Sequence, residues 1–168
     1  MHVATKIVLV IGALMTAGGA VLVVMGGSDI VEIDTFVLEN VTNGTVEIVD
    51  DDGEGDLGVT FWMKGNYTDV DDDGYWDHCN STNISIIMHP EIAGWSEGYG
   101  GEFYYEAGDW DVYGASDCKS DDRNKHMEHE SEGLIKVGRA CLACYEGTFE
   151  FESNASVWVT YDDEVIGD

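Results

Sequence analysis

The sequence predicts an all-β protein: an antiparallel β-sandwich of about eight strands that follows a single N-terminal transmembrane helix. The strands are predicted by short runs of alternating apolar and polar residues, rich in β-branched and aromatic side chains. Clusters of Gly, Asn and Asp separate these runs, as turns require. The helix is predicted by one long stretch without charge near the N-terminus.

The uncharged stretch covers residues 7–27 and reads IVLVIGALMTAGGAVLVVMGG. As a helix it would span roughly 30 Å, about the thickness of a hydrocarbon core. Lys6 precedes it and acidic residues follow it, so we expect residues 1–6 in the cytoplasm and the remainder outside the cell membrane. A cleaved signal peptide and the helix of a pilin-like filament subunit are the alternatives.

The remaining chain is predicted to consist of a juxtamembrane stretch with the first strand, residues 28–43, and an extracytoplasmic sandwich domain, residues 44–168. The polar segment 120–133 is expected to be a loop or a short exposed helix. Eight alternating runs predict the strands. These runs cover residues 31–38, 45–49, 59–64, 84–89, 102–107, 134–138, 148–152 and 156–161.

The charge balance is strongly acidic, with 34 Asp and Glu against 7 Lys and Arg and a formal net charge of -27. Such a surface repels phosphate backbones, so the sequence predicts no nucleic-acid partner. In composition it is similar to halophilic and marine archaeal surface proteins. Hydrophobic residues still make up 44% of the chain, which excludes a disordered acidic tail.

Six Asn-x-Ser/Thr sequons follow the apolar stretch, as an exported and glycosylated domain requires. Their asparagines are Asn40, Asn43, Asn66, Asn80, Asn83 and Asn154.

Four cysteines predict two disulfides outside the membrane. The pairing Cys79–Cys118 with Cys141–Cys144 joins sequence neighbours and is the first expectation. A long-range pairing of Cys79 or Cys118 with the Cys141-Leu-Ala-Cys144 segment would close larger loops and stabilise more.

Residues 69–77, DVDDDGYWD, place oxygen ligands at alternate positions, with Gly74 at the sixth position. The stretch resembles the calcium loops of EF-hands, and more closely the DxDxDGxxD loops of dockerins and thrombospondin type 3 repeats. The resemblance implies one bound calcium ion, for which a glycine relieves the sharp bend. The implied ligands are Asp69, Asp71, Asp73, the Tyr75 carbonyl, Asp77 and, at the twelfth position, Asn80. Asn80 replaces a bidentate acid, so a weak site on the order of 0.1–1 mM is expected.

An octet related to this loop occurs earlier in the chain. Residues 49–56, VDDDGEGD, repeat the pattern of residues 70–77, VDDDGYWD, but Ile48 stands at the place of Asp69. We therefore expect the cation in the second copy, and an acidic turn in the first.

Two other groups of residues suggest chemistry. A Cys-x-x-Cys pair could be redox-active, but Cys141 and Cys144 lie between strand-like runs, which favours a structural disulfide. His126 and His129, with Glu128 and Glu130, could bind a transition metal, and His78 and His89 could join them.

Two further groups suggest binding. The aromatic residues of the glycine-rich segment could form the core, or could stack on sugars or on a partner protein. They are Trp95, Tyr99, Phe103, Tyr104, Tyr105, Trp110 and Tyr113. A local basic patch could bind an acidic partner, including a second copy of the chain. It comprises Lys119, Arg123, Lys125, Lys136 and Arg139.

These observations predict a membrane-anchored, extracellular structural or binding protein, stabilised by calcium and glycans and acting as a cell-surface or assembly subunit. Its expected partners are the membrane and another protein or a second copy of itself, with carbohydrate as a further candidate. An exported thiol-disulfide or metal-dependent enzyme is one alternative, and a pilin-like filament subunit is the other.

Overall fold

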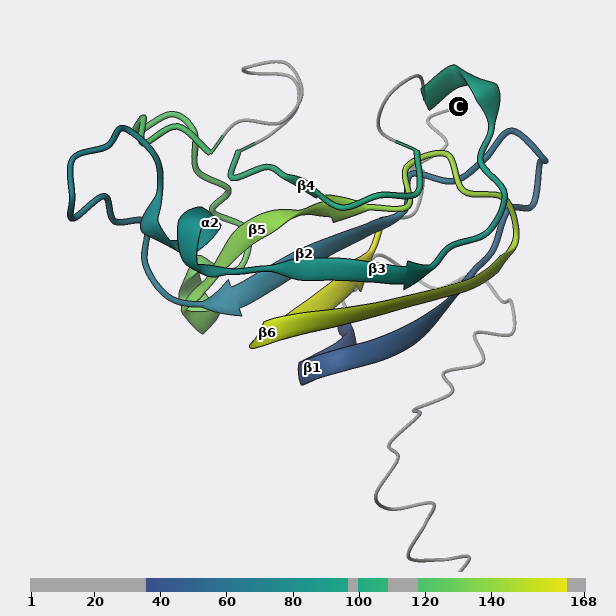
Figure 1. Ribbon diagram of the computed structural model, residues 1–168, viewed down its shortest axis with the longest axis horizontal. Helices are drawn as coiled ribbons and strands as arrows, with labels where there is room; N and C mark the ends of the chain where they lie inside the picture. Colours follow the sequence, from purple (N-terminus) through teal and green to yellow (C-terminus); the bar gives the residue numbers. More distant parts are fainter. Residues whose placement is uncertain (1–35, 97–99, 109–117, 163–168) are drawn as a thin grey trace, which may run out of the picture.

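The computed structural model describes residues 36–96, 100–108 and 118–162. Its strands are β1 (Phe36–Ile48), β2 (Val59–Lys64), β3 (Ile84–Met88), β4 (Tyr104–Tyr105), β5 (Leu134–Ala140) and β6 (Gly147–Tyr161). The helical segments are α2 (Asp77–Ser81) and the 3₁₀ turns η1 (Gly94–Ser96) and η2 (Glu130–Glu132). Every pair of these strands is antiparallel, which confirms the predicted all-β class (Figure 1).

Hydrogen bonds join the six strands into one sheet in the order β1-β6-β2-β5-β4, and β3 also pairs with β6. The long strand β6 has β1 along one edge. Its other edge pairs with β2 at residues 158–161 and with β3 at residues 150–153. β6 therefore organises the sheet, because three strands use it as their partner.

The described residues form six strands in one hydrogen-bonded sheet, and not the eight short strands that the alternating runs predicted. All eight runs contribute to strands, but two pairs of runs merge. Residues 36–38 and 45–48 of two runs fall on β1, and residues 148–152 and 156–161 fall on β6, while residues 31–35 lie outside the described residues. The intervening Asn- and Gly-rich residues were interpreted as turns. They are irregularities within the β1-β6 ladder, where the register shifts between Val41 and Asn43 and Asn40 has a φ of 52°.

β6 bends sharply, and the bend brings two parts of the sheet face to face. Phe61 on β2 is paired with Val159 of β6, yet its ring centroid lies 4.9 Å from that of Phe151. Eight positions separate Val159 from Phe151, which would be about 26 Å along a straight strand. The register irregularities of β1 and β6 therefore allow the sheet to fold over its own core, as Figure 1 shows.

The main core lies inside this fold, and one disulfide lies within it. Apolar side chains from β1, β2, β3, β5 and β6 pack there with Cys141 and Cys144. The rings of Phe61, Phe149 and Phe151 form its aromatic centre. A second, smaller cluster contains Trp76 and Ala107 with the other two cysteines.

The disulfides are Cys79–Cys118 and Cys141–Cys144, the pairing that sequence proximity favoured. In the described part of the chain, no helix is long and apolar enough to cross a membrane. The predicted span, residues 7–27, lies outside the described residues. The polar segment 120–133 forms turns and η2, and β1 runs through the position where residues 28–43 were expected to meet the sandwich domain.

Candidate metal site and its surroundings

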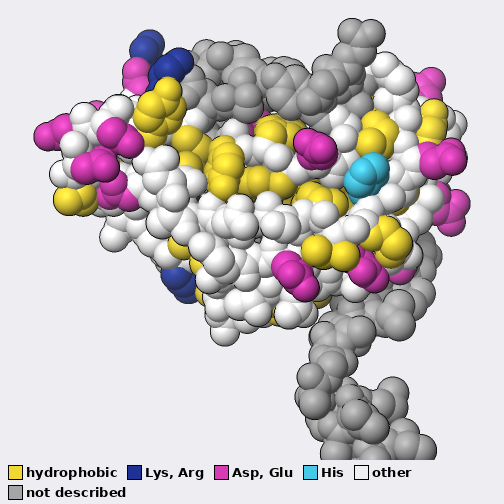
Figure 2. Space-filling model, viewed as in Figure 1, with side chains coloured by type: hydrophobic (Ala, Val, Ile, Leu, Met, Phe, Trp, Pro, Cys, Tyr) yellow, Lys and Arg dark blue, Asp and Glu magenta, His cyan; other side chains and the backbone are white. Residues whose placement is uncertain are grey.

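Residues 68–77 form a loop that its own carboxylates shape. Asp72 and Gly74 have positive φ values of 55° and 87°, a conformation that Asp tolerates better than most residues and Gly adopts freely. Space around Gly74 is open, so its backbone conformation and not close packing explains the glycine. The loop also forms the left end of the molecule in Figure 2, where Asp and Glu side chains gather.

Asp69 is the anchor of the loop. Its Oδ1 accepts a hydrogen bond from the backbone N–H of Asp73 at 3.1 Å, and its Oδ2 accepts one from Gly74 at 3.1 Å. The hydroxyl of Ser120 donates to the same Oδ2. The Ser120 hydrogen bond, followed by the backbone hydrogen bonds, lowers the pKa of the Asp69 carboxyl, because these donors favour the charged form.

Asp77 closes the other end of the loop. Its Oδ2 accepts a hydrogen bond from the Thr68 hydroxyl at 2.9 Å, and both oxygens lie within 3.2 Å of the backbone nitrogen of Val70. The backbone N–H of Asp77 donates to the Thr68 carbonyl at 2.8 Å. These bonds fix the carboxylate of Asp77 opposite that of Asp69.

Asp69, Asp71 and Asp77 each offer a carboxylate oxygen within 4.8 Å of the other two, so this triad could hold a metal ion. Calcium binds oxygens at about 2.4 Å, which places two of its ligands at most about 4.8 Å apart. Asp71 accepts no hydrogen bond from the part of the chain that the structure describes. Three anionic groups at this spacing repel one another, and a cation would offset that repulsion.

The other predicted ligands lie beside the triad but not in it. The Oδ1 of Asp73 accepts a hydrogen bond from the backbone N–H of Tyr75 at 2.8 Å. The Oδ2 of Asp73 accepts one from the Nδ2 of Asn80 at 2.9 Å. Asp73 and Asn80 therefore pair with each other, and the backbone of Tyr75 forms a bridge to Lys119.

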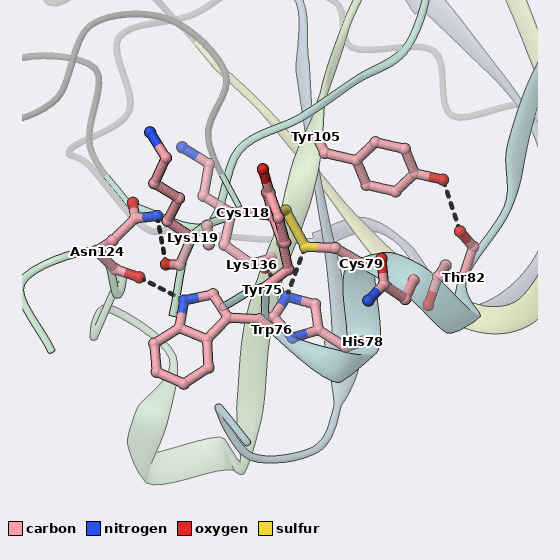
Figure 3. Close-up of a disulfide and its surroundings, with 12 residues drawn as sticks. Tyr75, Trp76, His78, Cys79, Thr82, Tyr105, Cys118, Lys119, Asn124 and Lys136 are labelled. Atoms are coloured by element: carbon pink, nitrogen blue, oxygen red, sulfur yellow. Dashed lines mark hydrogen bonds between the residues drawn. A yellow bond between two sulfur atoms is a disulfide. The ribbon is translucent and has the colours of Figure 1, made fainter. Parts of the chain in front are cut away.

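The loop is tied to the Cys79–Cys118 disulfide (Figure 3). The backbone N–H of Trp76 donates to the Cys118 carbonyl at 2.8 Å, and that of Ser120 donates to the Gly74 carbonyl at 2.9 Å. The indole N–H of Trp76 donates to the Asn124 carbonyl at 3.0 Å. An ion bound by the triad would therefore also order the segment that carries Cys118.

His78 lies behind the loop and is only 6% exposed. Its Nε2 donates a hydrogen bond to the Lys136 carbonyl at 3.0 Å, and its buried Nδ1 has no partner among the described residues. Burial lowers the pKa of this imidazole to about 4, because the charged form loses its hydration. His78 is therefore neutral at physiological pH and serves as a core residue.

The first copy of the octet forms a turn without an acidic triad. The Oδ1 of Asp50 accepts a hydrogen bond from the backbone of Gly53 at 2.9 Å, and the Oδ1 of Asp52 accepts one from Glu54 at 2.8 Å. Within the described residues, the second copy alone gathers three carboxylates at metal-binding distance. Asp56, at the end of the first copy, pairs with Cys144. Each copy thus lies against a disulfide.

The Cys141–Cys144 disulfide is completely buried, at 0% exposure for both residues. The backbone of Asp56 forms two hydrogen bonds with the segment that carries this disulfide. Its N–H donates to the Cys144 carbonyl at 2.9 Å, and its carbonyl accepts from the Ala143 N–H at 2.7 Å. Thiol exchange needs access to a sulfur atom, which this packing denies. The geometry therefore fits a structural disulfide.

The His-rich segment does not form a metal set within the described residues. His126 and His129 pack against the ring of Trp62, with ring centroids 5.1 and 4.5 Å away. Their Nδ1 atoms face Glu128 and Glu132, at 3.5 and 3.3 Å. His89 donates from Nδ1 to the carbonyl of Pro90. These histidines are explained by packing and by local hydrogen bonds.

All six sequon asparagines are exposed, so each is accessible as a glycan acceptor. Asn40 and Asn43 lie on β1, and Asn83 precedes β3. The backbone N–H of Asn83 donates to the Oδ1 of Asn154 at 2.8 Å, which joins these two sites.

The basic residues divide among separate ion pairs. Arg123 pairs with Asp121 at 3.2 Å, and Arg139 pairs with Asp162 at 2.8 Å. Lys136 is buried with Glu106.

Of the aromatic segment, Trp95 is half exposed, whereas Tyr104 is buried and Phe103 and Tyr105 border the core. Tyr99, Trp110 and Tyr113 lie outside the described residues.

Sequence reasoning missed two residues that matter to this region. Ser120 reaches Asp69 from 51 positions away, and Glu106 meets Lys136 across 30 positions. His78 was considered as a metal ligand but belongs to the core. No local pattern marks a contact at such separation. The only signal was that Ser120 follows Cys118, which the disulfide brings to the loop.

No protein-family model matches this chain, and no curated protein or solved structure is significantly similar to it. The described residues offer a carboxylate triad suited to a hard cation. They also contain two disulfides.

Proposed function

We propose that this chain is a membrane-anchored, extracytoplasmic structural or binding protein that acts as a cell-surface or assembly subunit. Residues 7–27 would be its anchor, and one calcium ion and N-linked glycans would stabilise its exported domain, for which a sandwich is the expected architecture. The observation that carries the proposal is the acidic triad in a loop joined to the Cys79–Cys118 segment. An ion bound there would stabilise a fold that works outside the cell.

Calcium would be bound by Asp69, Asp71 and Asp77, and its charge would offset three packed carboxylates. The high negative charge suits a medium rich in salt or divalent ions, which screens self-repulsion. The role is structural and non-enzymatic. Protein partners or self-association are proposed for the surface, with carbohydrate as a further candidate. The burial of Cys141 and Cys144 weighs against the thiol-disulfide alternative, and the filament alternative concerns residues outside the described ones.

The proposal is tested by thermal unfolding with calcium and with a chelator. At calcium 10 to 100 times above the dissociation constant, binding to the folded state alone adds about 1.4 to 2.7 kcal/mol to the unfolding free energy. The Asp71→Asn variant should lose most of this gain, because it removes one anionic ligand. In chelator it should be at least as stable as the wild type, because one repulsive charge is gone.

Asp72→Asn is the matched control, since it makes the same charge change one position away, outside the triad. Asn also tolerates the positive φ at that position. It should keep the calcium response. If calcium does not stabilise the wild type, or if both variants lose the response equally, residues 69–77 are an acidic turn.

A further inference from the structure

Lys136 and Glu106 form a buried ion pair away from the acidic loop. Lys136 is 5% exposed and Glu106 is 3% exposed, and Nζ of Lys136 contacts Oε1 of Glu106. Lys136 belongs to β5, and Glu106 follows β4 directly. The two strands are neighbours in the sheet, and the backbone N–H of Glu106 donates to the Val137 carbonyl at 3.2 Å.

The surroundings hold the two groups together but do not satisfy the carboxylate. The carbonyl of Gly108 accepts a second hydrogen bond from Nζ at 3.2 Å, which aims the amine. Oε2 of Glu106 is buried and has no hydrogen-bond partner among the described residues. A buried ion pair is costly unless all its lone pairs are satisfied, and a buried orphan acceptor adds to that cost.

We propose that Lys136 and Glu106 become joined by an intramolecular amide bond. The bond between Nζ and Cδ forms, and one bond between Cδ and an Oε atom breaks. Of the three protons on the ammonium, two leave with that oxygen as water and one stays on the amide nitrogen. The sum is an ammonium and a carboxylate that give an amide and one water, with no oxidant or reductant.

Three features of the site favour the step. Contact between the two groups replaces a bimolecular encounter with a local one, and effective molarities for well-oriented groups reach roughly 10⁵–10⁸ M. Exclusion of water opposes hydrolysis of the product. The amide removes two buried charges and leaves one carbonyl oxygen in place of the carboxylate. The bond would tie β5 to the segment after β4, and the His78–Lys136 hydrogen bond places it near the first disulfide (Figure 3).

Mass spectrometry of the purified full-length chain tests the proposal. After reduction, denaturation and proteolysis, peptides that contain Glu106 and Lys136 should appear as one branched species, lighter than their sum by one water. Trypsin should not cleave after Lys136, and an amine-labelling reagent should modify the other lysines but not this one. The Lys136→Arg variant keeps the charge but lacks the amine, so it should yield only linear peptides.

The wild-type peptides alone show whether the amide bond is present, so the test does not depend on how well the variant folds. Linear peptides, with Lys136 cleaved and labelled like the other lysines, would overturn the proposal. A loss of water that maps to an Asp-Gly step, at Asp52-Gly53 or Asp73-Gly74, would indicate a cyclic imide and would also overturn it. A linkage of Lys136 to any other residue would overturn the assignment to Glu106.

Discussion

The hydroxyl of Ser120 donates a hydrogen bond to Oδ2 of Asp69 across 51 positions of the chain. This bond joins the acidic loop to the segment that begins at Cys118, so the site and the disulfide are parts of one local structure. A substitution in the acidic loop should therefore change the stability of the disulfide segment, and a substitution in that segment should change the loop.

Ser120→Ala should raise the pKa of the Asp69 carboxyl toward its ordinary value of 3.8, because the hydroxyl is the leading cause of the lowered value. A lowered pKa stabilises the folded state above the unfolded pKa, and this stabilisation is lost as the pH falls through the folded pKa. The variant should therefore be less stable at neutral pH and lose less on acidification. NMR titration of the side-chain carboxyls in chelator measures the shift. Asp121, whose pKa Arg123 lowers, is the internal control and should not move.

His78 should make the protein less stable between pH 6.5 and about 4. Its pKa is about 4 in the folded state against 6.5 in the unfolded chain, so the unfolded state binds more protons in this window. Stability is full above pH 6.5 and falls as the pH drops. The 2.5-unit difference corresponds to roughly 3 kcal/mol of unfolding free energy at most. Below about pH 4 this group contributes no further loss.

Urea unfolding of the wild type and of His78→Gln at several pH values checks this effect. Glutamine can still donate to the Lys136 carbonyl but does not titrate in this range. The difference in stability between the two proteins should change with pH across the window and be constant above it. A constant difference throughout would show that His78 carries its charge without cost in the fold.

The strands could be predicted well from sequence, whereas their merging and bending could not. The run of β-branched and aromatic residues at 59–64 predicts β2 at its observed bounds, although four consecutive side chains of this strand are buried and exposure does not alternate. Asn40 and residues 153–155 read as turns, because turns and bulges favour the same residue types. The face-to-face packing of Phe61 and Phe151 depends on that bend, which no local pattern encodes.

In the candidate site, too, local sequence predicts some features, and others follow only from the three-dimensional arrangement. The spacing of acids places Asp69, Asp71 and Asp77 among the expected ligands, and these three form the acidic triad, whereas the first copy gathers no such triad among the described residues. The pairing of Asp73 with Asn80 was missed, because position alone does not tell whether a carboxylate faces an ion or a neighbouring amide. Contacts from distant strands, such as that between Glu106 and Lys136, follow only from the topology.

The two disulfides should differ in their contribution to stability. Cys79–Cys118 spans 39 positions and Cys141–Cys144 spans 3. By loop-closure entropy, the first adds about 4 kcal/mol and the second about 2 kcal/mol. Unfolding of the two Cys→Ala double variants in urea tests the order. A larger loss for Cys141→Ala/Cys144→Ala would mean that cavity formation in the main core outweighs loop closure.

The two disulfides should also differ in their accessibility to reductant, which chemical labelling of the native protein measures. Under mild reductant, the Cys79–Cys118 pair should react first, because its cysteines are slightly exposed while Cys141 and Cys144 are fully buried. Mass spectrometry after alkylation reads the order. If Cys141 and Cys144 were reduced and alkylated first, the segment would open readily, and a redox role for this pair would gain support.

Gly58 should be irreplaceable, because it combines a positive φ with a close backbone contact. Its φ is 87°, and an added Cβ would lie 2.3 Å from the Ala140 carbonyl oxygen and 2.7 Å from that of Cys141. These are backbone atoms of the strand end and the buried disulfide, so neither can yield cheaply. Gly53 has a similar φ of 77° but nothing within 4 Å of the added Cβ.

Gly53→Ala is therefore the matched control, and it should cost about 1–2 kcal/mol for the left-handed conformation alone. Gly58→Ala should cost clearly more, since Asp56 and Gly58 hold the first octet against Cys144 and the β5 end. Urea unfolding of both variants measures the difference. Equal costs would mean that the contact with the Cys141–Cys144 segment relaxes without penalty, and that the first octet is not a fixed support of the main core.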